Sequence, residues 1–146
     1  MAQNKPAVLV LWGNYFDEYI ATAFVCELRA AGVRVRIVGL DGRLARGRYG
    51  MMLGTDLSLE RVRALQQPVT HVVAPCSGAQ WAALQDKPHA AEFMQRLTAG
   101  GAVFIAAGES EMAGATPPLP LPALRLWPPE MRAGEVARQL VREIAP

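Results

Sequence analysis

An alternation of short apolar runs with longer stretches of helical periodicity constrains this fold more than any other feature. Residues 7–12 (AVLVLW) are apolar throughout and end at Gly13, which is typical of a strand buried on both faces. Residues 17–32 repeat apolar side chains at three- and four-residue steps, which predicts a helix with one core-facing side. Residues 33–40 predict a second strand, parallel to the first and reached by a right-handed crossover. The expected core-facing side of the helix consists of Ile20, Phe24, Leu28 and Ala31.

The same alternation continues along the rest of the chain. Residues 41–50 read as a polar, glycine-rich loop, and residues 51–65 predict a short strand or turn followed by a helix whose N-cap is Asp56 or Ser58. Strands that alternate with helices predict a single α/β domain over residues 1–146, with an open, mostly parallel, flavodoxin-like sheet and helices on both faces. Further strands are expected at residues 70–75, 102–107 and 123–127, and further helices within residues 51–65, 78–101 and 133–144.

Composition argues against several classes of partner. The formal net charge is +2 and charged residues make up 19% of the chain, so no nucleic-acid partner is expected. The apolar run at residues 7–12 is too short to cross a membrane, so no membrane partner is expected and a cytoplasmic location is the default. Two cysteines and two histidines occur without metal-ligand spacing, so neither a metal nor another cofactor is expected.

The candidate site follows from the expected sheet. In open parallel sheets, ligands bind at the carboxyl ends of strands, near the point where the strand order reverses. Function is therefore expected at residues 13–18, 75–78 and 106–111, each of which follows or ends an expected strand. The residues expected to bind a ligand there are Asn14, Tyr15, Glu18, Cys76, Ser77, Gly108, Glu109 and Ser110.

Four segments together resemble the ThiJ/PfpI family of the class I glutamine amidotransferase-like superfamily. They are VLVLWGNYFDEYIATAFVCELRAAGVRVRIVGL, GTDLSLERV, THVVAPCSGAQ and GGAVFIAAGESEMAG, which span most of residues 7–114 in the family's order. The resemblance implies a flavodoxin-like fold and a homodimer. It also implies that the C-terminal part is shortened here, because a proline-rich segment and one helix replace the family's last third.

The family's reaction, as the resemblance implies it, uses a cysteine on the turn after a central strand, a glutamate from the loop after the first strand and, in many members, a downstream histidine. Alignment places Ala106 at the cysteine position. Counting back from the end of the first helix places Ile20 at the glutamate position, with Glu18 two residues away. No histidine follows His89. The nucleophile is therefore expected to be lost.

If the chain is an enzyme that uses other positions than the family does, three residues are catalytic candidates: Cys76, Glu109 and Glu18. Cys76 and Ser77 replace a family Gly-Gly pair that helps to hold an oxyanion, and a following helix N-terminus would favour a thiolate at Cys76. The alternative is an inert cysteine that lines a pocket. Glu18, Glu109 and Glu111 would form an acidic cluster if their loops converge, or would simply complement helix dipoles. Ser110 lacks a downstream histidine, so we interpret it as an N-cap rather than a nucleophile.

Other side chains leave alternatives open. Arg43, Arg46 and Arg48 either bind an anion or RNA, or belong to a solvated loop. The aromatic residues at the end of the first strand line a ligand pocket or pack in a subunit interface; they are Trp12, Tyr15 and Phe16. Cys26 is interpreted as a packing residue of the first helix.

The leading prediction is a catalytically degenerate ThiJ/PfpI-like domain that binds a small ligand or a protein partner at the strand carboxyl ends, with a second copy of itself as an expected partner. One alternative is an enzyme that uses Cys76 or the Glu18, Glu109 and Glu111 group. The other is a structural or assembly subunit that docks through its proline-rich segment, which includes residues 116–122.

Overall fold

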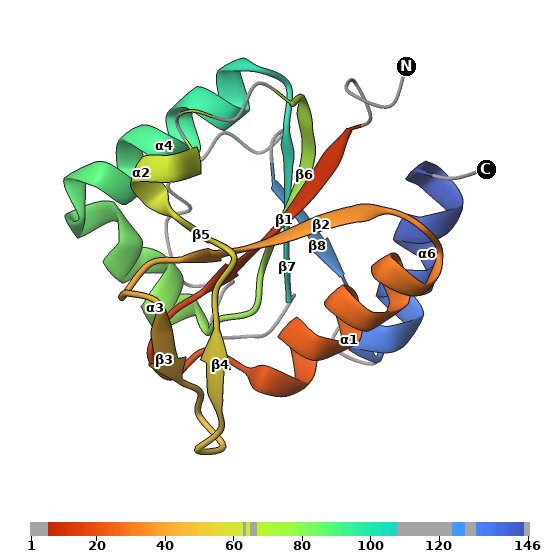
Figure 1. The fold of residues 1–146 in the computed structure, drawn as a ribbon, viewed down its shortest axis with the longest axis horizontal. Helices are drawn as coiled ribbons and strands as arrows, with labels where there is room; N and C mark the ends of the chain where they lie inside the picture. The colour runs from red at the N-terminus through yellow and green to blue at the C-terminus, as the bar shows by residue number, and fades with distance from the viewer. Residues whose placement is uncertain (1–5, 63, 65–66, 108–123, 128–130, 145–146) are drawn as a thin grey trace.

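A six-stranded, wholly parallel sheet forms the centre of the molecule (Figure 1). The computed structural model describes residues 6–62, 64, 67–107, 124–127 and 131–144. The strands lie in the order β5-β2-β1-β6-β7-β8, which confirms the predicted open parallel sheet. Their bounds are β1 (Ala7–Trp12), β2 (Arg34–Gly39), β5 (Leu57–Ser58), β6 (Val69–Ala74), β7 (Val103–Ala107) and β8 (Leu124–Trp127).

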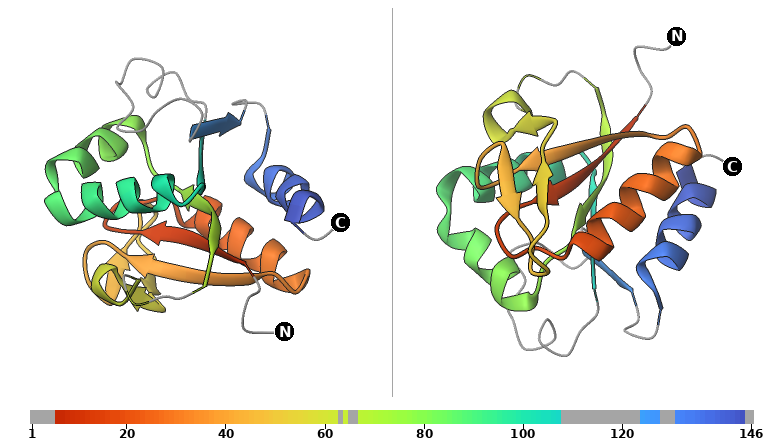
Figure 2. Two further views of the ribbon diagram at one scale, coloured as in Figure 1. Left: turned by 90° about the horizontal axis from the view of Figure 1, so that it is seen from above. Right: turned by 60° about the horizontal axis from the view of Figure 1, so that its bottom comes forward.

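Helices cover both faces of this sheet (Figure 2). On one face, α1 packs against α6, and on the other lie α2, α3 and α4. The strand order reverses between β1 and β6, because the chain leaves β1 toward one edge and leaves β6 toward the other. The bounds of the helices are α1 (Glu18–Ala30), α2 (Leu59–Val62), α3 (Gly78–Ala83), the 3₁₀ helix η2 (Leu84–Asp86), α4 (Pro88–Ala99) and α6 (Ala133–Ile144).

The core is built from the buried strands and one side of each long helix. Every residue of β1 is buried, as expected for a central strand with helices on both faces. In α1, Phe24 and Leu28 are fully buried, and the Phe24 ring lies 5.7 Å from that of Trp127 on β8. Two parts of the α1 prediction are wrong: Ala31 lies beyond the end of the helix and is exposed, and Cys26 is exposed rather than packed.

A β-hairpin replaces the loop that was predicted at residues 41–50. Its strands, β3 (Leu44–Arg46) and β4 (Met52–Gly54), are antiparallel and lie outside the main sheet. Only Ala45 of β3 is buried, so periodicity does not reveal this strand, whereas β4 lies in the stretch where a short strand or turn was expected. The hairpin stands below the sheet in Figure 1, beside the start of α1.

The N-cap that the sequence left open is resolved in favour of Ser58. Its Oγ accepts a hydrogen bond from the Arg61 backbone N at 3.2 Å, at the start of α2. Asp56 instead accepts from the Ile37 backbone N at 2.8 Å and so ties the loop before β5 to β2. Within the described part of the chain, no helix is long and apolar enough to cross a membrane.

Candidate functional site

The loops that follow β1 and β6 meet at the carboxyl edge of the sheet, where the strand order reverses. The Asp17 backbone N donates to the Pro75 carbonyl at 2.8 Å. The Gln80 Nε2 of α3 donates to the Asn14 carbonyl at 3.2 Å. Residues 13–18 and 75–78 therefore do come together, as the sequence predicted, and these two direct hydrogen bonds hold them to each other.

A charged contact ties the loop after β2 to the same edge. Asp41 accepts from the Asn14 backbone N at 2.9 Å and from the Lys87 Nζ at 2.8 Å. Burial alone would raise the pKa of the Asp41 carboxyl, but these two donors outweigh it and hold that pKa below its ordinary value. Asp41 thus fixes the position of Asn14, one of the predicted ligand-binding residues, and was not found from the sequence.

Glu18 is the first residue of α1 and the only buried charged side chain in the described part of the chain. Its carboxylate accepts hydrogen bonds from the backbone N of Tyr49, at 3.0 Å to each oxygen, and from that of Met51 at 2.9 Å. Burial raises the pKa of this carboxyl, but the donated hydrogen bonds and the nearby Arg48 outweigh burial, so the pKa lies below its ordinary value. Glu18 is therefore ionised at neutral pH.

The turn of the β3–β4 hairpin encloses this carboxylate. Gly47 and Gly50 close a four-residue turn through a Gly50 N to Gly47 O hydrogen bond of 3.0 Å. A Cβ atom at Gly47 would overlap the carboxylate carbon of Glu18. The Glu18 hydrogen bonds that the structure shows go to hairpin backbone, so this side chain, a predicted catalytic candidate, fixes the hairpin in place. The pattern Gly-Arg-Tyr-Gly at residues 47–50 was the one sequence signal of this turn.

Cys76 and Ser77 occupy the bend between β6 and α3. Cys76 is buried, and its backbone N donates to the Ala74 carbonyl at 2.9 Å. Ser77 forms a capping box with Gln80: its Oγ accepts from the Gln80 N, and its own N donates to the Gln80 Oε1. The Oγ and the backbone N of Ser77 are thus both used to cap the N-terminus of α3.

Ala106 lies at the expected nucleophile position near the end of β7. It is fully buried and pairs with Ala74 of β6 and Leu126 of β8. A methyl group in a packed strand offers no acid, base or nucleophile. The predictions made for Gly108, Glu109, Ser110 and Glu111, and for the proline-rich residues 116–122, lie outside the described residues.

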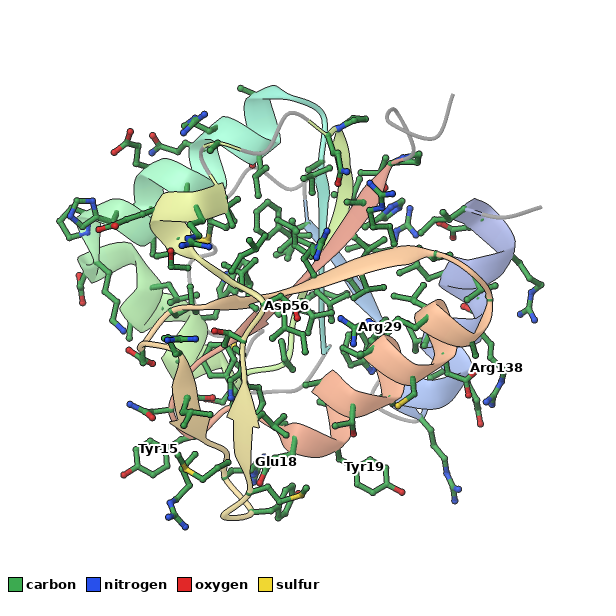
Figure 3. All side chains as sticks on the ribbon, viewed as in Figure 1. Tyr15, Glu18, Tyr19, Arg29, Asp56 and Arg138 are labelled. Carbon is green, nitrogen blue, oxygen red and sulfur yellow. The ribbon has the colours of Figure 1, made fainter. Side chains whose placement is uncertain are left out.

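Large apolar side chains gather on the surface around Glu18. The aromatic cluster expected at the end of β1 is divided: the Trp12 and Phe16 rings are buried and 6.3 Å apart, whereas Tyr15 points outward. Tyr15 and Tyr19 lie on either side of Glu18 at the lower edge of Figure 3. The aromatic–methionine patch defined by these exposed residues, each 49% to 77% exposed, consists of Tyr15, Tyr19, Tyr49, Met51 and Met52.

Hydrogen bonds from backbone N–H groups join the segments that carry this patch. The Tyr15 N donates to the Arg46 carbonyl of β3 at 2.8 Å, and Tyr49 and Met51 both bind Glu18, the residue before Tyr19. Three segments, the loop after β1, the start of α1 and the hairpin, therefore lie next to one another, and each carries exposed apolar side chains. An exposed apolar cluster of this kind is typical of an interaction surface.

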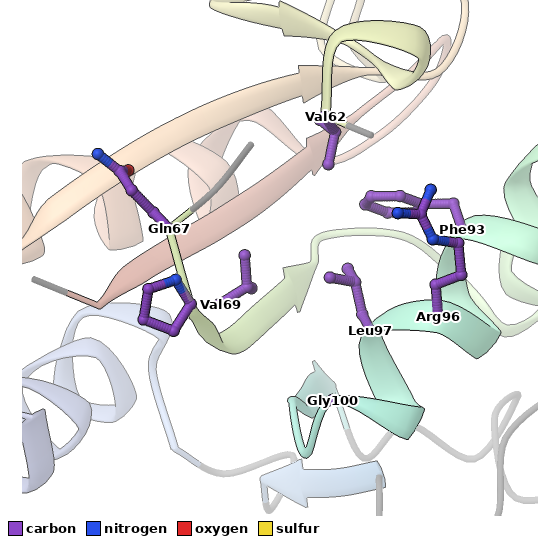
Figure 4. Close-up of a pocket in the computed structure, with 8 residues that line it drawn as sticks. Val62, Gln67, Val69, Phe93, Arg96, Leu97 and Gly100 are labelled. Carbon is purple, nitrogen blue, oxygen red and sulfur yellow. The ribbon is translucent and has the colours of Figure 1, made fainter. Parts of the chain in front are cut away.

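A cavity of about 200 Å³ lies at the opposite, amino edge of the sheet (Figure 4). Its apolar walls are Val62 of α2, Val69 of β6, and Phe93 and Leu97 of α4. None of the residues predicted from the sequence to bind a ligand lines this cavity.

The parallel sheet, the reversal between β1 and β6 and the helices on both faces define a flavodoxin-like α/β protein. No protein-family model and no curated protein matches the sequence. Solved structures do match. Drosophila melanogaster DJ-1beta is 17% identical with a TM-score of 0.76, over 97% of this chain and 91% of that one.

Two further structures agree. Oxidised DJ-1 from Toxoplasma gondii is 16% identical with a TM-score of 0.70, over 96% of both chains. A mutant DJ-1 superfamily protein from Salmonella typhimurium is 22% identical with a TM-score of 0.62, and the match covers 72% of this chain and 56% of that one. The chain therefore has the fold of the DJ-1/ThiJ/PfpI superfamily, as its sequence pattern predicted.

Proposed function

We propose that this chain is a non-catalytic domain that docks a protein partner, in the first place a second copy of itself, through the aromatic–methionine patch at its carboxyl edge. The observation that carries this proposal is the gathering of five exposed large side chains around a buried, backbone-bound carboxylate. Two residues support the absence of catalysis that we propose. Glu18, two residues from the family's glutamate position, is bound by the hairpin, and Ala106, at the family's cysteine position, carries only a methyl group.

Charge balance favours a second copy as the occupant. The segments that carry the patch, residues 13–19 and the β3–β4 hairpin, contain two positive and two negative side chains: Arg46, Arg48, Asp17 and Glu18. Arg48 pairs with Asp17 at 3.7 Å and lies over the Tyr49 ring, 5.3 Å from its centroid. Because a two-fold interface brings one patch against itself, a patch with a net charge would repel its copy. This patch is neutral and apolar, so it is self-complementary in both respects.

The backbone of Tyr15 supports a functional role for the patch. Tyr15 has φ 66°, and it is the one non-glycine residue with positive φ among the described residues. The left-handed region costs an ordinary residue about 1 kcal/mol or more. Strain of this kind persists chiefly where a side chain is needed in a particular place. Here it places a large aromatic ring in the patch, where it is 70% exposed.

Sedimentation equilibrium of the full chain over a range of concentrations tests the proposal. We expect reversible self-association of the unmodified chain, weakened about tenfold or more by Tyr15→Asn, because truncation of a central aromatic contact commonly costs about 2 kcal/mol. Asparagine tolerates the left-handed conformation, so this variant keeps the fold. Leu126→Thr on β8 is the matched control, since Leu126 is also an exposed apolar residue, with 47% exposure, outside the patch.

Two results would overturn the proposal. One is a chain that stays monomeric at every concentration. The other is equal loss of association in Tyr15→Asn and Leu126→Thr, which would place the interface elsewhere. Turnover of an ester or glyoxal-type substrate that depends on Cys76 would instead support the relocated enzyme. The cytoplasmic location expected from the sequence stays a prediction.

A further inference from the structure

The structure separates the three arginines of residues 43–48 that the sequence grouped as possible anion ligands. The Arg46 Nη1 donates to the Gly50 carbonyl at 3.1 Å and so serves the hairpin turn. Arg48 pairs with Asp17 and covers the Tyr49 ring. Arg43 has neither role: only its carbonyl is used, as the acceptor for the Thr55 N at 3.0 Å. Arg43 lines a surface pocket instead.

This pocket lies where β2 and β5 end, beside the base of the β3–β4 hairpin. It has a volume of about 320 Å³, and a second arginine, Arg61 of α2, lines it together with Arg43. The remaining lining comes from the loop after β2 and from the segment that leads into β5; these residues are Gly42, Thr55, Asp56, Leu57 and Ser58. The pocket is thus formed by two segments, residues 42–43 and 55–61, and is lined mainly by polar groups.

The one acidic side chain of the pocket is already neutralised. The Asp56 Oδ2 accepts from the Arg29 Nη2 at 3.0 Å and from the Ile37 backbone N at 2.8 Å. Figure 3 shows Asp56 and Arg29 close together at the front of the molecule. Because Arg29 balances the charge of Asp56, the pocket keeps the two positive charges of Arg43 and Arg61.

Hydroxyl and backbone groups complete a site for oxygen anions. The Ser58 Oγ accepts from the Arg61 N at 3.2 Å, so its own hydroxyl proton remains available to donate. Gly42 has φ +103°, and no atom lies within 4 Å of the position of a Cβ there, so space adjoins its backbone. Two arginines and a serine that line one open pocket can supply donors to the oxygen atoms of a phosphate group, which arginine binds in a bidentate manner.

We infer that this pocket, the Arg43–Arg61 pocket, binds a small phosphate monoester. Its volume is near the lower end of the range for small-molecule sites, which suits a phosphate that carries a few carbon atoms. A nucleic-acid strand would require positive charges in a row along a surface. Here, Arg46 donates to the Gly50 carbonyl within the hairpin, and Arg48 pairs with Asp17 before α1, so these neighbours of Arg43 do not extend its positive charge into a row. The inference rests on other residues than the docking patch and stands independently of it.

NMR titration of the ¹⁵N-labelled full chain with inorganic phosphate and with glycerol phosphate, at fixed ionic strength, tests this site. We expect saturable shifts at the Gly42 and Ser58 amides, with tighter binding of glycerol phosphate than of phosphate alone. Arg43→Gln and Arg61→Gln should each weaken binding about tenfold, because each removes a charge-assisted hydrogen-bonding group. Arg142→Gln is the matched control, as an exposed arginine in the last turn of α6, and should leave binding unchanged.

Three outcomes would overturn the inference. The first is the absence of saturable shifts with either phosphate compound. The second is an equal loss of affinity in Arg142→Gln, which would show a general charge effect. The third is binding of a single-stranded RNA oligonucleotide through Arg43 and Arg61 in the absence of glycerol phosphate binding, which would assign the pocket to a polymer.

Discussion

At the scale of single residues, the Glu18 carboxylate stabilises the fold, although it lies at the edge of the sheet where a catalytic residue was expected. The hairpin turn covers the Glu18 carboxylate, and the backbone N–H groups of Tyr49 and Met51 donate hydrogen bonds to it. An unpaired buried charge would be strongly unfavourable, whereas a charge that accepts several hydrogen bonds is stabilised. The side chain therefore joins α1 to a hairpin that lies outside the main sheet.

The lowered pKa of Glu18 predicts how Glu18→Gln changes stability with pH. Because the folded-state pKa lies below the ordinary 4.5, the carboxylate contributes stability that is fully present above pH 4.5 and is lost as the pH falls through the folded pKa. We expect Glu18→Gln to lower the free energy of unfolding by about 1–2 kcal/mol at pH 7. This difference should shrink below pH 4.5.

Urea denaturation between pH 3 and pH 7, followed by tryptophan fluorescence, measures that difference. Glu27→Gln is the control, because Glu27 forms an exposed pair with Arg138 at 3.1 Å, and such pairs contribute about 0–1 kcal/mol. A difference between Glu18→Gln and the unmodified chain that stays constant with pH would contradict the role assigned to the ionised carboxylate.

At the scale of elements, a close contact with α1 is one of several that hold the β3–β4 hairpin, beside the hydrogen bond from the Trp12 Nε1 of β1 to the Ala45 carbonyl at 3.1 Å. A Cβ atom at Gly47 would overlap the Glu18 side chain, whereas one at Gly54 would meet only ordinary contact, 3.6 Å from the Leu44 Cδ2. We expect Gly47→Ala to lower the free energy of unfolding by about 1–3 kcal/mol, because the enclosed carboxylate has to move. Gly54→Ala, in the same hairpin, should have a much smaller effect.

Amide hydrogen exchange locates the change predicted for Gly47→Ala. Protection should fall at the Tyr49 and Met51 amides, which donate to Glu18, while the amides of β1 keep theirs. Equal losses of stability in Gly47→Ala and Gly54→Ala would show instead that the hairpin tolerates no added side chain at either position.

Most of the main sheet and the long helices could be predicted from the sequence, and the first strand of the hairpin could not. β1 was predicted from its continuous apolar run, and β2 and α6 were predicted because their apolar residues repeat at the period of a strand or a helix. β4 lies where a short strand or turn was expected, but β3 has three residues and one buried side chain, so no period marks it.

The candidate site was predicted only in part. The meeting of the loops after β1 and β6 follows from the general rule for parallel sheets, and it was predicted. The partners of Glu18 lie 31 and 33 residues away and donate through their backbone, so no side-chain pattern points to them. The Arg43–Arg61 pocket was missed in the same way, because Arg61 joins it only through the fold.

At the scale of the whole molecule, the carboxyl edge carries two distinct surfaces. The aromatic–methionine patch is apolar and neutral, and the Arg43–Arg61 pocket beside β5 is polar and positive. The first suits a copy of the chain and the second a small anion. The same β3–β4 hairpin contributes to one and adjoins the other, because its turn lies over Glu18 and its base lies beside Gly42.

Methionine-methyl NMR of the full chain at increasing concentration tests the proposed docking surface most directly. Met51 and Met52 belong to the patch, whereas Met94 is buried in α4 and serves as an internal control. We predict that the methyl signals of Met51 and Met52 shift and broaden together as the concentration rises, while that of Met94 stays unchanged, and that Tyr15→Asn suppresses the change. Met51 and Met52 signals that do not depend on concentration, in a chain that nevertheless associates, would contradict the account.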